Sequence, residues 1–372
     1  MRNFTFKGLF LTAVFMLLGC LSIQAANDDL ITKQITINLD KAGTLPNKIA
    51  SSEMYKITNL KIIGEINGTD WNMIREMAGR DNRGYGTEGK FSVLDLSKAK
   101  IVKGGDSYYP GDNCYTSNDE IGEKAFTDCS RLTSLTLPVG ITSIGYDAFA
   151  YCSGLTSLTL PAGITSIGEY AFYGCSGLTS LTLPAGITSI GDDTFYGCSG
   201  LTSLTLPAGI TSIGEYAFSG CSGLTSLTLP AGITSIDKYA FSGCSRLTSL
   251  TLPAGITSIG EFAFSYCSGL TSIYVYAEKV PRIGRYAFEG CASRKCTLYV
   301  PKGTYDNYRL SEFGYFENIV EFDATGIDKT TTSTDVEEVS RYSLNGQRLA
   351  VPVKGLNIVK YSDGTARKVV VK

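Results

Sequence analysis

The sequence of 372 residues contains no histidine, and this absence excludes several kinds of chemistry. Without imidazole the chain has no Ser–His–Asp or Cys–His catalytic pair, no histidine-ligated zinc site and no histidine switch near neutral pH. Tryptophan occurs once, only 18% of the residues are charged, and the formal net charge is −2. Because a nucleic-acid-binding surface is strongly basic, we expect no nucleic acid partner.

Familiar catalytic motifs are missing from the sequence as well. It has no nucleophile elbow, P-loop or dinucleotide fingerprint. Asp192 and Asp193 are an adjacent acidic pair, but neighbours on a chain usually point in different directions, whereas glycosidases hold two carboxyl groups across a cleft. We therefore predict that the protein is not an enzyme and has no catalytic residues, metal site or cofactor.

Long apolar runs are scarce, and the one near a basic segment spans residues 8–23. It is short for a transmembrane helix and typical of a secretory signal, so we predict a signal peptide over residues 1–25. Cleavage before Ala26 suits signal peptidase I, whereas residues 17–20 resemble a lipobox that would place a lipid anchor on Cys20. We prefer the first route because apolar residues continue past Cys20. Either route predicts a secreted protein or one on the outer-membrane cell surface, without a membrane span after signal removal.

A repeat of 23 residues dominates the chain. Near-identical copies of LTSLTLPVGITSIGYDAFAYCSG begin at Leu132, Leu155, Leu178, Leu201, Leu224 and Leu247. Partial copies flank them, so the repeated region spans residues 91–301. The alternation L-x-x-L-x-L is typical of a strand with one buried face, Pro-Ala-Gly indicates a turn, and I-T-S-I-G indicates a second short extended segment.

One repeat is too small to fold alone, because its few apolar side chains cannot offset the entropy lost on ordering 23 residues. In the first copy the residues predicted to face inward are Leu132, Leu135, Leu137, Ile141, Ile144, Ala148, Phe149 and Cys152. Stacked neighbours must share this buried surface. The sequence therefore predicts a β-rich solenoid of 23-residue coils with a parallel sheet and a cap at each end.

The motif LTSLTLPxGITSIGxxAFxxCSG resembles the repeat of BspA-like bacterial leucine-rich-repeat surface proteins, and the resemblance covers residues 55–322. Segments before and after the repeats are similar to the terminal caps of this family, so we place an α/β N-terminal cap at 26–90 and a C-terminal cap at 302–322. In the first cap we expect a helix that starts at Thr69 or Asp70 and runs to about Ala78. The resemblance implies a cell-surface protein.

After Phe322 the composition changes to a polar, threonine-rich linker at residues 323–339. Residues 340–372 then alternate short strand patterns with Asn-Gly and Asp-Gly turns, which predicts a small β unit. This unit resembles the C-terminal sorting or anchoring tails of proteins that use type IX secretion. The resemblance implies a surface or extracellular location.

The first candidate contact surface is a face of hydroxyl groups on the first strand of each repeat. Its members are Ser134, Thr136, Ser157, Thr159, Ser180, Thr182, Ser203, Thr205, Ser226, Thr228, Ser249 and Thr251. A flat rank of Thr and Ser could bind extended glycans or peptides. The alternative is that this face has only a structural role, because β-branched Thr favours the strand conformation and its hydroxyl keeps the outer face of the sheet hydrated.

The second candidate is the insertion at residues 103–120, since long loops on regular scaffolds often carry binding residues. Tyr108, Tyr109 and Tyr115 are the candidate contacts, and a disordered or self-packed loop is the alternative. Further aromatics occur where the repeats differ, after the second Ile of each copy. These positions are either a contact surface or ordinary sequence variation at the edge of the coils.

Cysteines recur every 23 residues from Cys129 to Cys267. We interpret them as a column of buried thiols that act as small hydrophobic groups, because equivalent positions in stacked coils are poorly placed for disulfides. Cys114 and the pair Cys291 and Cys296 are less regular and are better candidates for disulfides. The column also lacks the C-x-x-C pairing of sulfur metal sites.

Together these patterns predict an exported surface protein for protein–protein or adhesive interactions. The family resemblance implies that its partners are proteins or glycans of the host matrix or of bacterial surfaces. One alternative is a structural solenoid that acts as a spacer or display scaffold without a specific ligand. The other is a glycan-binding or glycan-cleaving solenoid.

Overall fold

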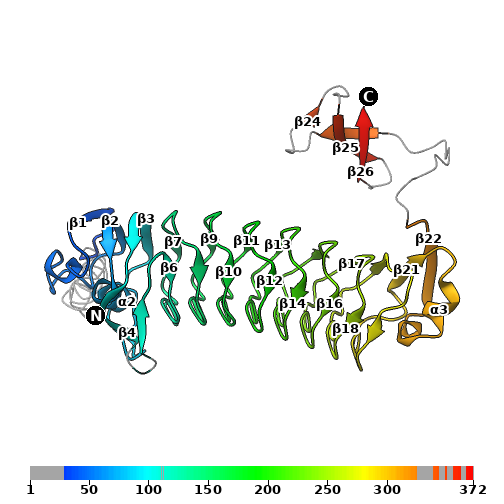
Figure 1. Cartoon of the computed structure of the whole chain (residues 1–372), viewed down its shortest axis with the longest axis horizontal. Coiled ribbons are helices and arrows are strands. Elements are labelled where there is room, and N and C mark those ends of the chain that lie inside the picture. The colour runs from blue at the N-terminus through cyan, green and yellow to red at the C-terminus, as the bar shows by residue number, and fades with distance from the viewer. Residues whose placement is uncertain are drawn as a thin grey trace, which may run out of the picture. The chain divides into compact units, whose positions relative to one another are not determined.

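In the computed structural model, residues 29–109, 111, 113–324, 338–342, 348–349, 355–361 and 366–371 are described. The predicted signal peptide, the alternative anchor at Cys20 and most of the predicted linker lie outside these residues. Internal contacts divide the chain into two compact units, Met1–Ala324 and Thr325–Lys372. The first unit is a row of stacked coils with a cap at each end (Figure 1), which confirms the predicted solenoid. No described helix is long and apolar enough to cross a bilayer.

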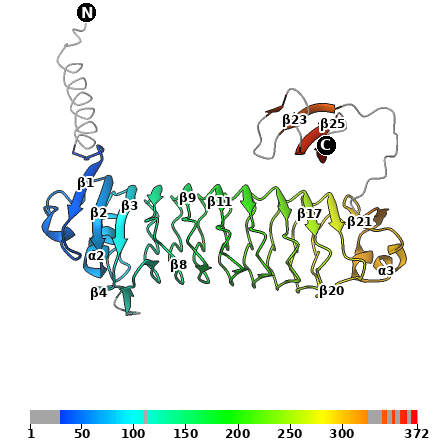
Figure 2. The ribbon, with the colours of Figure 1, turned by 45° about the horizontal axis from the view of Figure 1, so that its top comes forward.

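Each regular coil supplies one strand to each of two parallel sheets, whose repetition along the row is visible in Figure 2. The first series of strands is β7 Ser134–Thr136, β9 Ser157–Thr159, β11 Ser180–Thr182, β13 Ser203–Thr205, β15 Ser226–Thr228, β17 Ser249–Leu252, β19 Ser272–Val275 and β21 Thr297–Pro301. The second series is β6 Glu120–Ile121, β8 Ser143–Ile144, β10 Ser166–Ile167, β12 Ser189–Ile190, β14 Ser212–Ile213, β16 Ser235–Ile236, β18 Ser258–Ile259 and β20 Arg282–Ile283.

The register pairs identical positions of successive coils, such as Ser134 with Ser157 and Leu135 with Leu158. Each sheet is interrupted once among the described residues, the first between β13 and β15 and the second between β10 and β12. Because the two interruptions fall between different coils, every adjacent pair of coils keeps at least one strand pairing. The backbone ladder therefore continues through the whole row.

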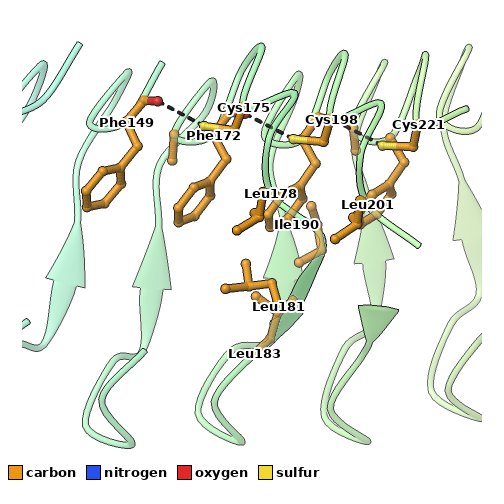
Figure 3. Close-up of a cluster of buried hydrophobic side chains, with 14 of the residues drawn as sticks. Phe149, Phe172, Cys175, Leu178, Leu181, Leu183, Ile190, Cys198, Leu201 and Cys221 are labelled. Carbon is orange, nitrogen blue, oxygen red and sulfur yellow. Dashed lines mark hydrogen bonds between the residues drawn. The ribbon is translucent and has the colours of Figure 1, made fainter. Parts of the chain in front are cut away.

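The core is a set of columns in which one residue type repeats from coil to coil. All eight residues predicted to face inward in the first copy are buried, as the alternating pattern required. The clearest column consists of phenylalanine rings whose centroids lie 5.1–5.5 Å apart and whose planes differ by no more than 10°; its members are Phe126, Phe149, Phe172, Phe195, Phe218, Phe241, Phe264 and Phe288. Figure 3 shows part of this column beside the buried leucines.

The N-terminal cap extends the first sheet by three strands, β1 Ile35–Leu39, β2 Asn59–Ile66 and β3 Val93–Ile101, and the last of them pairs with β7. A short 3-10 helix, η1 Leu45–Asn47, and the helix α2 Gly68–Met77 complete the cap. The ring of Trp71 on α2 lies 5.2 Å from that of Phe126, and its indole nitrogen donates to the Ala125 carbonyl at 2.9 Å. Trp71 therefore closes the phenylalanine column at this end.

The predicted start of this helix is wrong by a few residues, because Asn67 is the N-cap. Its side chain accepts a hydrogen bond from the Thr69 amide at 3.1 Å, and the Asp70 carboxylate accepts one from the Asn67 amide at 3.0 Å. Asp70 also accepts from the Gly43 and Leu45 amides. It therefore acts inside a capping box and fixes the preceding loop, a role that its position in the sequence does not reveal.

At the other end, β22 Asn318–Phe322 pairs with β21, and α3 Tyr305–Arg309 and the 3-10 helix η3 Glu312–Tyr315 lie between them in sequence. Phe313 and Phe316 contact the ring of Phe288 at 5.7 and 5.2 Å. These rings end the phenylalanine column at the predicted C-terminal cap.

The second unit is a four-stranded antiparallel sheet with the strand order β24-β23-β25-β26. Its strands are β23 Glu338–Tyr342, β24 Arg348–Leu349, β25 Gly355–Tyr361 and β26 Ala366–Val371. This confirms the small β unit predicted for the tail. The Asn-Gly and Asp-Gly turns lie outside the described residues.

The phenylalanine column generates a prediction about stability. Phe195 stacks between Phe172 and Phe218 at 5.3 and 5.2 Å, so Phe195→Ala should lower the free energy of unfolding by about 3–5 kcal/mol. Chemical denaturation followed by circular dichroism measures this loss. Val139→Ala is the control, because Val139 is exposed and its truncation should change stability by less than about 0.5 kcal/mol. Equal midpoints for the two variants would contradict the role of the column.

Candidate binding surface

The predicted hydroxyl face forms on the first sheet. In β7, β9, β11 and β15 the Ser and Thr side chains are exposed and the Leu between them is buried. Ser203 and Thr205 of β13 are also exposed, with Leu204 between them partly buried, whereas Ser249 and Thr251 of β17 are partly covered. Because strands pair in register on each side of the interruption between β13 and β15, the twelve residues line up as one rank of Ser and one rank of Thr.

A third rank of threonines beside this face has a structural role. The Thr156 hydroxyl donates to the Thr133 carbonyl at 3.3 Å, and the Thr179 hydroxyl donates to the Thr156 carbonyl at 3.2 Å. The same bond recurs in later coils from Thr202, Thr225, Thr248 and Thr271. These hydroxyls are used by the array itself, since each one ties its coil to the preceding coil.

The hydroxyls of the predicted face differ in this respect. Across the described part of the chain, none of the twelve has a protein hydrogen-bond partner, so water or a ligand must satisfy them. A shallow hollow on this face lies between β9 and β11, where Ser157, Thr159, Ser180 and Thr182 line it together with neighbouring apolar residues. No charged side chain lines the hollow. The surface is therefore polar, uncharged and repetitive.

The insertion is a β-hairpin, β4 Gly104–Tyr109 and β5 Cys114–Thr116, which packs against α2 rather than forming an open loop. The prediction that Tyr108 is a contact residue is wrong. Its side chain is 1% exposed, lies 6.2 Å from the Trp71 ring, and donates its hydroxyl to the Glu123 carbonyl at 2.8 Å. Burial also raises the pKa of Tyr108. The residue anchors the hairpin because strand alternation turns it toward the core.

The other two tyrosines of the insertion have different surroundings. Tyr109 is half-buried, with the Arg75 guanidinium 5.2 Å and the Lys124 ammonium 5.3 Å from its ring centroid. Tyr115 is 55% exposed and is the one tyrosine of this group with a largely free ring.

The acidic side chains of the insertion do not form a metal site in the described part of the chain. Asp106 accepts a hydrogen bond from the Thr69 hydroxyl at 2.8 Å. The described residues contain no cluster of three or more acidic or cysteine side chains that could hold a metal ion.

The repeated cysteines form the predicted column of buried thiols. From Cys152 onward each sulfur donates to the phenylalanine carbonyl one coil earlier, as for Cys175 and Phe149 at 3.0 Å and Cys198 and Phe172 at 3.2 Å (Figure 3). Burial raises the pKa values of the Cys152 and Cys198 thiols, and it raises the pKa of Cys129 to about 11. The column links side chain to backbone between coils, which the sequence period alone did not indicate.

No disulfide joins the cysteines in the described residues, so the candidate bridge between Cys291 and Cys296 is not formed. The Cys291 sulfur donates to the Phe264 carbonyl at 3.2 Å and thus continues the column. Cys114 is buried in β5. The departure from the regular spacing reflects an insertion in the last coils and does not produce a bridge.

Comparison with known proteins is consistent with the parallel solenoid of repeated leucine-rich coils. Residues 115–208 and 188–319 match the family described as BspA type leucine rich repeat region, in six copies. These matches cover more than half of the chain, which therefore belongs to this family. No curated protein matches the chain in sequence.

Several solved structures are similar to the chain. A leucine-rich repeat protein from Bacteroides ovatus is 28% identical over 56% of this chain and 59% of its own, with a TM-score of 0.42. The T. pallidum leucine rich repeat protein is 32% identical over 41% and 72%, with a TM-score of 0.39. A leucine rich cell surface protein from Faecalibacterium prausnitzii is 21% identical over 77% and 87%, with a TM-score of 0.31. The chain thus spans less than two thirds of the Bacteroides ovatus protein.

The thiol column predicts slow chemical modification of the folded protein. At pH 8 the thiolate is the reactive form, and a raised pKa together with burial keeps its population small. Iodoacetamide should therefore label the native column at least ~10-fold more slowly than the unfolded chain. Mass spectrometry of labelled peptides measures both rates. Equal rates, or cysteines that stay unlabelled in denaturant without a reductant, would show that the column is open or oxidised.

Proposed function

We propose that the protein is an exported leucine-rich-repeat protein of the cell surface that mediates adhesive or protein–protein interactions without catalysis. Its partners would be proteins or glycans of the host matrix or of bacterial surfaces. Export is supported by the predicted signal peptide at residues 1–25 and by the resemblance of the tail to sorting domains. Membership of the BspA-type family agrees with this location.

The observation that carries the proposal is the difference between the ranks of hydroxyl groups. The rank containing Thr156 and Thr179 is consumed by bonds between coils, whereas Thr159 and Thr182 are exposed and have no partner among the described residues. A purely structural ladder needs only the rank that contains Thr156 and Thr179. The rank that contains Thr159 and Thr182 leaves hydroxyl donors and acceptors available at each strand spacing, roughly 4.8 Å apart.

Such a surface suits an extended partner. Each hydroxyl contributes little alone, because water competes for the same hydrogen bonds. Identical groups on successive coils can however engage several units of a repetitive polymer at once, and the weak contacts then add through a high effective concentration. The absence of charge on the hollow between β9 and β11 favours a neutral polar partner such as a glycan or the backbone of an extended peptide.

The hydroxyl face on the first sheet, called the strand face below, should lose its partner when large charged side chains cover it. We expect the variant with Thr136, Thr159, Thr182 and Thr205 changed to Lys to reduce binding at least ~10-fold, because the ammonium groups would project from the contact plane. The measurement is quantitative retention of the full chain on immobilised host matrix and on whole bacterial surfaces. Circular dichroism shows whether the variant keeps its fold.

The matched control changes Ser143, Ser166, Ser189 and Ser212 to Lys, which adds the same charge to the second sheet. Retention should survive this change. If both variants bind equally well, the strand face is not the contact surface. If the wild-type chain binds neither preparation and tolerates deletion of one coil, residues 178–200, it is a spacer.

A further inference from the structure

A row of tyrosine rings lies along the coil edge where the repeats differ in sequence. This tyrosine edge consists of Tyr146, Tyr151, Tyr170, Tyr173, Tyr196 and Tyr216. Neighbouring ring centroids are 4.7–6.3 Å apart, so the rings form a continuous aromatic surface across four coils. Tyr146 is 40% exposed and Tyr151 is 52% exposed, and the remaining rings are half-buried.

Most neighbouring rings of this edge are tilted, although Tyr173 and Tyr196 stack 4.7 Å apart with planes that differ by 5°. The planes of Tyr146 and Tyr170 differ by 52°, and those of Tyr196 and Tyr216 differ by 63°. Tyr151 meets Tyr173 edge-on at 66°. Tilted rings leave part of their π faces uncovered, whereas stacked rings hide them. The edge therefore offers the electron-rich faces that attract cations.

The next coils provide a contrast within the same molecule. Tyr239 stacks on Tyr216 and on Phe262 with interplanar angles of 7° and 5°. Lys238 precedes Tyr239 in the chain, and Arg285 precedes Tyr286 on the edge of the last coil. Here the rings of Tyr216, Tyr239 and Phe262 all stack and basic residues neighbour the rings in sequence, so this segment offers less free ring surface and less net negative charge.

Charge distinguishes the tyrosine edge still more sharply. Residues 132–237 contain no lysine or arginine, and every acidic residue of this stretch lies beside the edge: Asp147, Glu169, Asp192, Asp193, Glu215 and Asp237. Within the described residues Glu169, Asp192 and Glu215 form no ion pair, and the four coils of residues 132–223 contain no lysine or arginine of their own, although Lys238 follows Glu215 at the equivalent position of the next coil. The aromatic surface is thus accompanied by a net negative charge.

Two of these carboxylates are already oriented by their neighbours. A hydrogen bond with the Asp193 carboxylate raises the pKa of the Tyr170 hydroxyl to about 12. An Asp192 oxygen accepts a hydrogen bond from the Glu215 amide at 2.8 Å and so ties two coils together. Glu169 and Glu215 have no such side-chain partner in the described part of the protein. They are the carboxylates most available to a ligand.

We propose that the tyrosine edge binds an extended basic segment of another polypeptide. Lysine and arginine side chains carry a long aliphatic stem and a cationic head. The stems would pack on the tyrosine rings, and the heads would reach the ring faces and the carboxylates of Glu169 and Glu215. This site is separate from the strand face, so each can fail without the other.

The test uses the full chain and a fluorescent ten-residue peptide of alternating arginine and glycine, with fluorescence anisotropy as the readout. The peptide should bind, and its affinity should fall as salt rises because exposed charges are screened. A peptide with glutamate in place of arginine should not bind. Failure of the basic peptide to bind at low ionic strength would overturn the proposal.

Two variants remove the two components of the site. Glu169→Gln with Glu215→Gln should weaken peptide binding about 5- to 20-fold through the loss of two charged contacts. Tyr146→Leu with Tyr173→Leu should cause a similar loss while keeping apolar side chains at both positions. Both variants must keep the circular dichroism spectrum and melting temperature close to those of the wild-type chain.

The controls carry the same chemical changes elsewhere on the molecule. Glu278→Gln with Glu312→Gln removes two exposed charges from the last coil and the C-terminal cap, and Tyr85→Leu with Tyr305→Leu removes two exposed rings from the caps. Each control should change the affinity less than about 2-fold. Equal losses in controls and site variants would overturn the proposal. So would binding of a neutral hexasaccharide that the tyrosine variant abolishes while the basic peptide binds no better than its acidic counterpart.

Discussion

Contact between identical positions of successive coils is the interaction on which the structure depends. A single 23-residue coil has too few apolar side chains to fold, so each ring of the phenylalanine column needs a neighbour above and below it. Each repeated cysteine from Cys152 to Cys267 adds a bond from its sulfur to the phenylalanine carbonyl one coil earlier, with distances of 3.0–3.4 Å. The ends of the row would leave this column open, and Trp71 at one end and Phe313 with Phe316 at the other close it.

The stacking of identical coils also determines how side chains are arranged on the surface. Because each coil repeats its predecessor, a side chain that points outward once does so in every copy, and hydroxyls, carboxylates and rings form lines rather than clusters. Lines of weak groups suit long partners, whose successive units meet successive coils. The hydroxyl lines and the tyrosine edge differ in charge and in apolar character. They are accordingly suited to partners of different chemistry.

The backbone at the tyrosine edge makes the recurrence of aromatic residues there more informative. Tyr170 and Tyr216 have φ angles of 58° and 53°, in a region that glycine or asparagine occupies at lower cost. A coil edge that had drifted without constraint would be expected to use those residues. Ring contacts with neighbouring coils offset part of this backbone cost. At Tyr239, stacking on Tyr216 and Phe262 is sufficient to explain why the residue is aromatic.

The sequence by itself determined the coil, its strands and its buried residues. A period of 23 with Leu, Ile, Phe and Cys at fixed positions leaves only one face to bury, so inward residues such as Leu135 and Phe149 followed directly from the pattern. The helix start at Asn67 depends on a local capping box with Asp70, which the sequence contains but the prediction missed. The burial of Tyr108 and the thiol at Cys291 were decided by tertiary structure, because the deciding partner, Trp71 or the Phe264 carbonyl, is set by packing that the pattern does not encode. The division of the threonines is the plainest case, because Thr179 and Thr182 look alike in the repeat. Only the stacking of coils brings a carbonyl within reach of one hydroxyl and leaves the other in water.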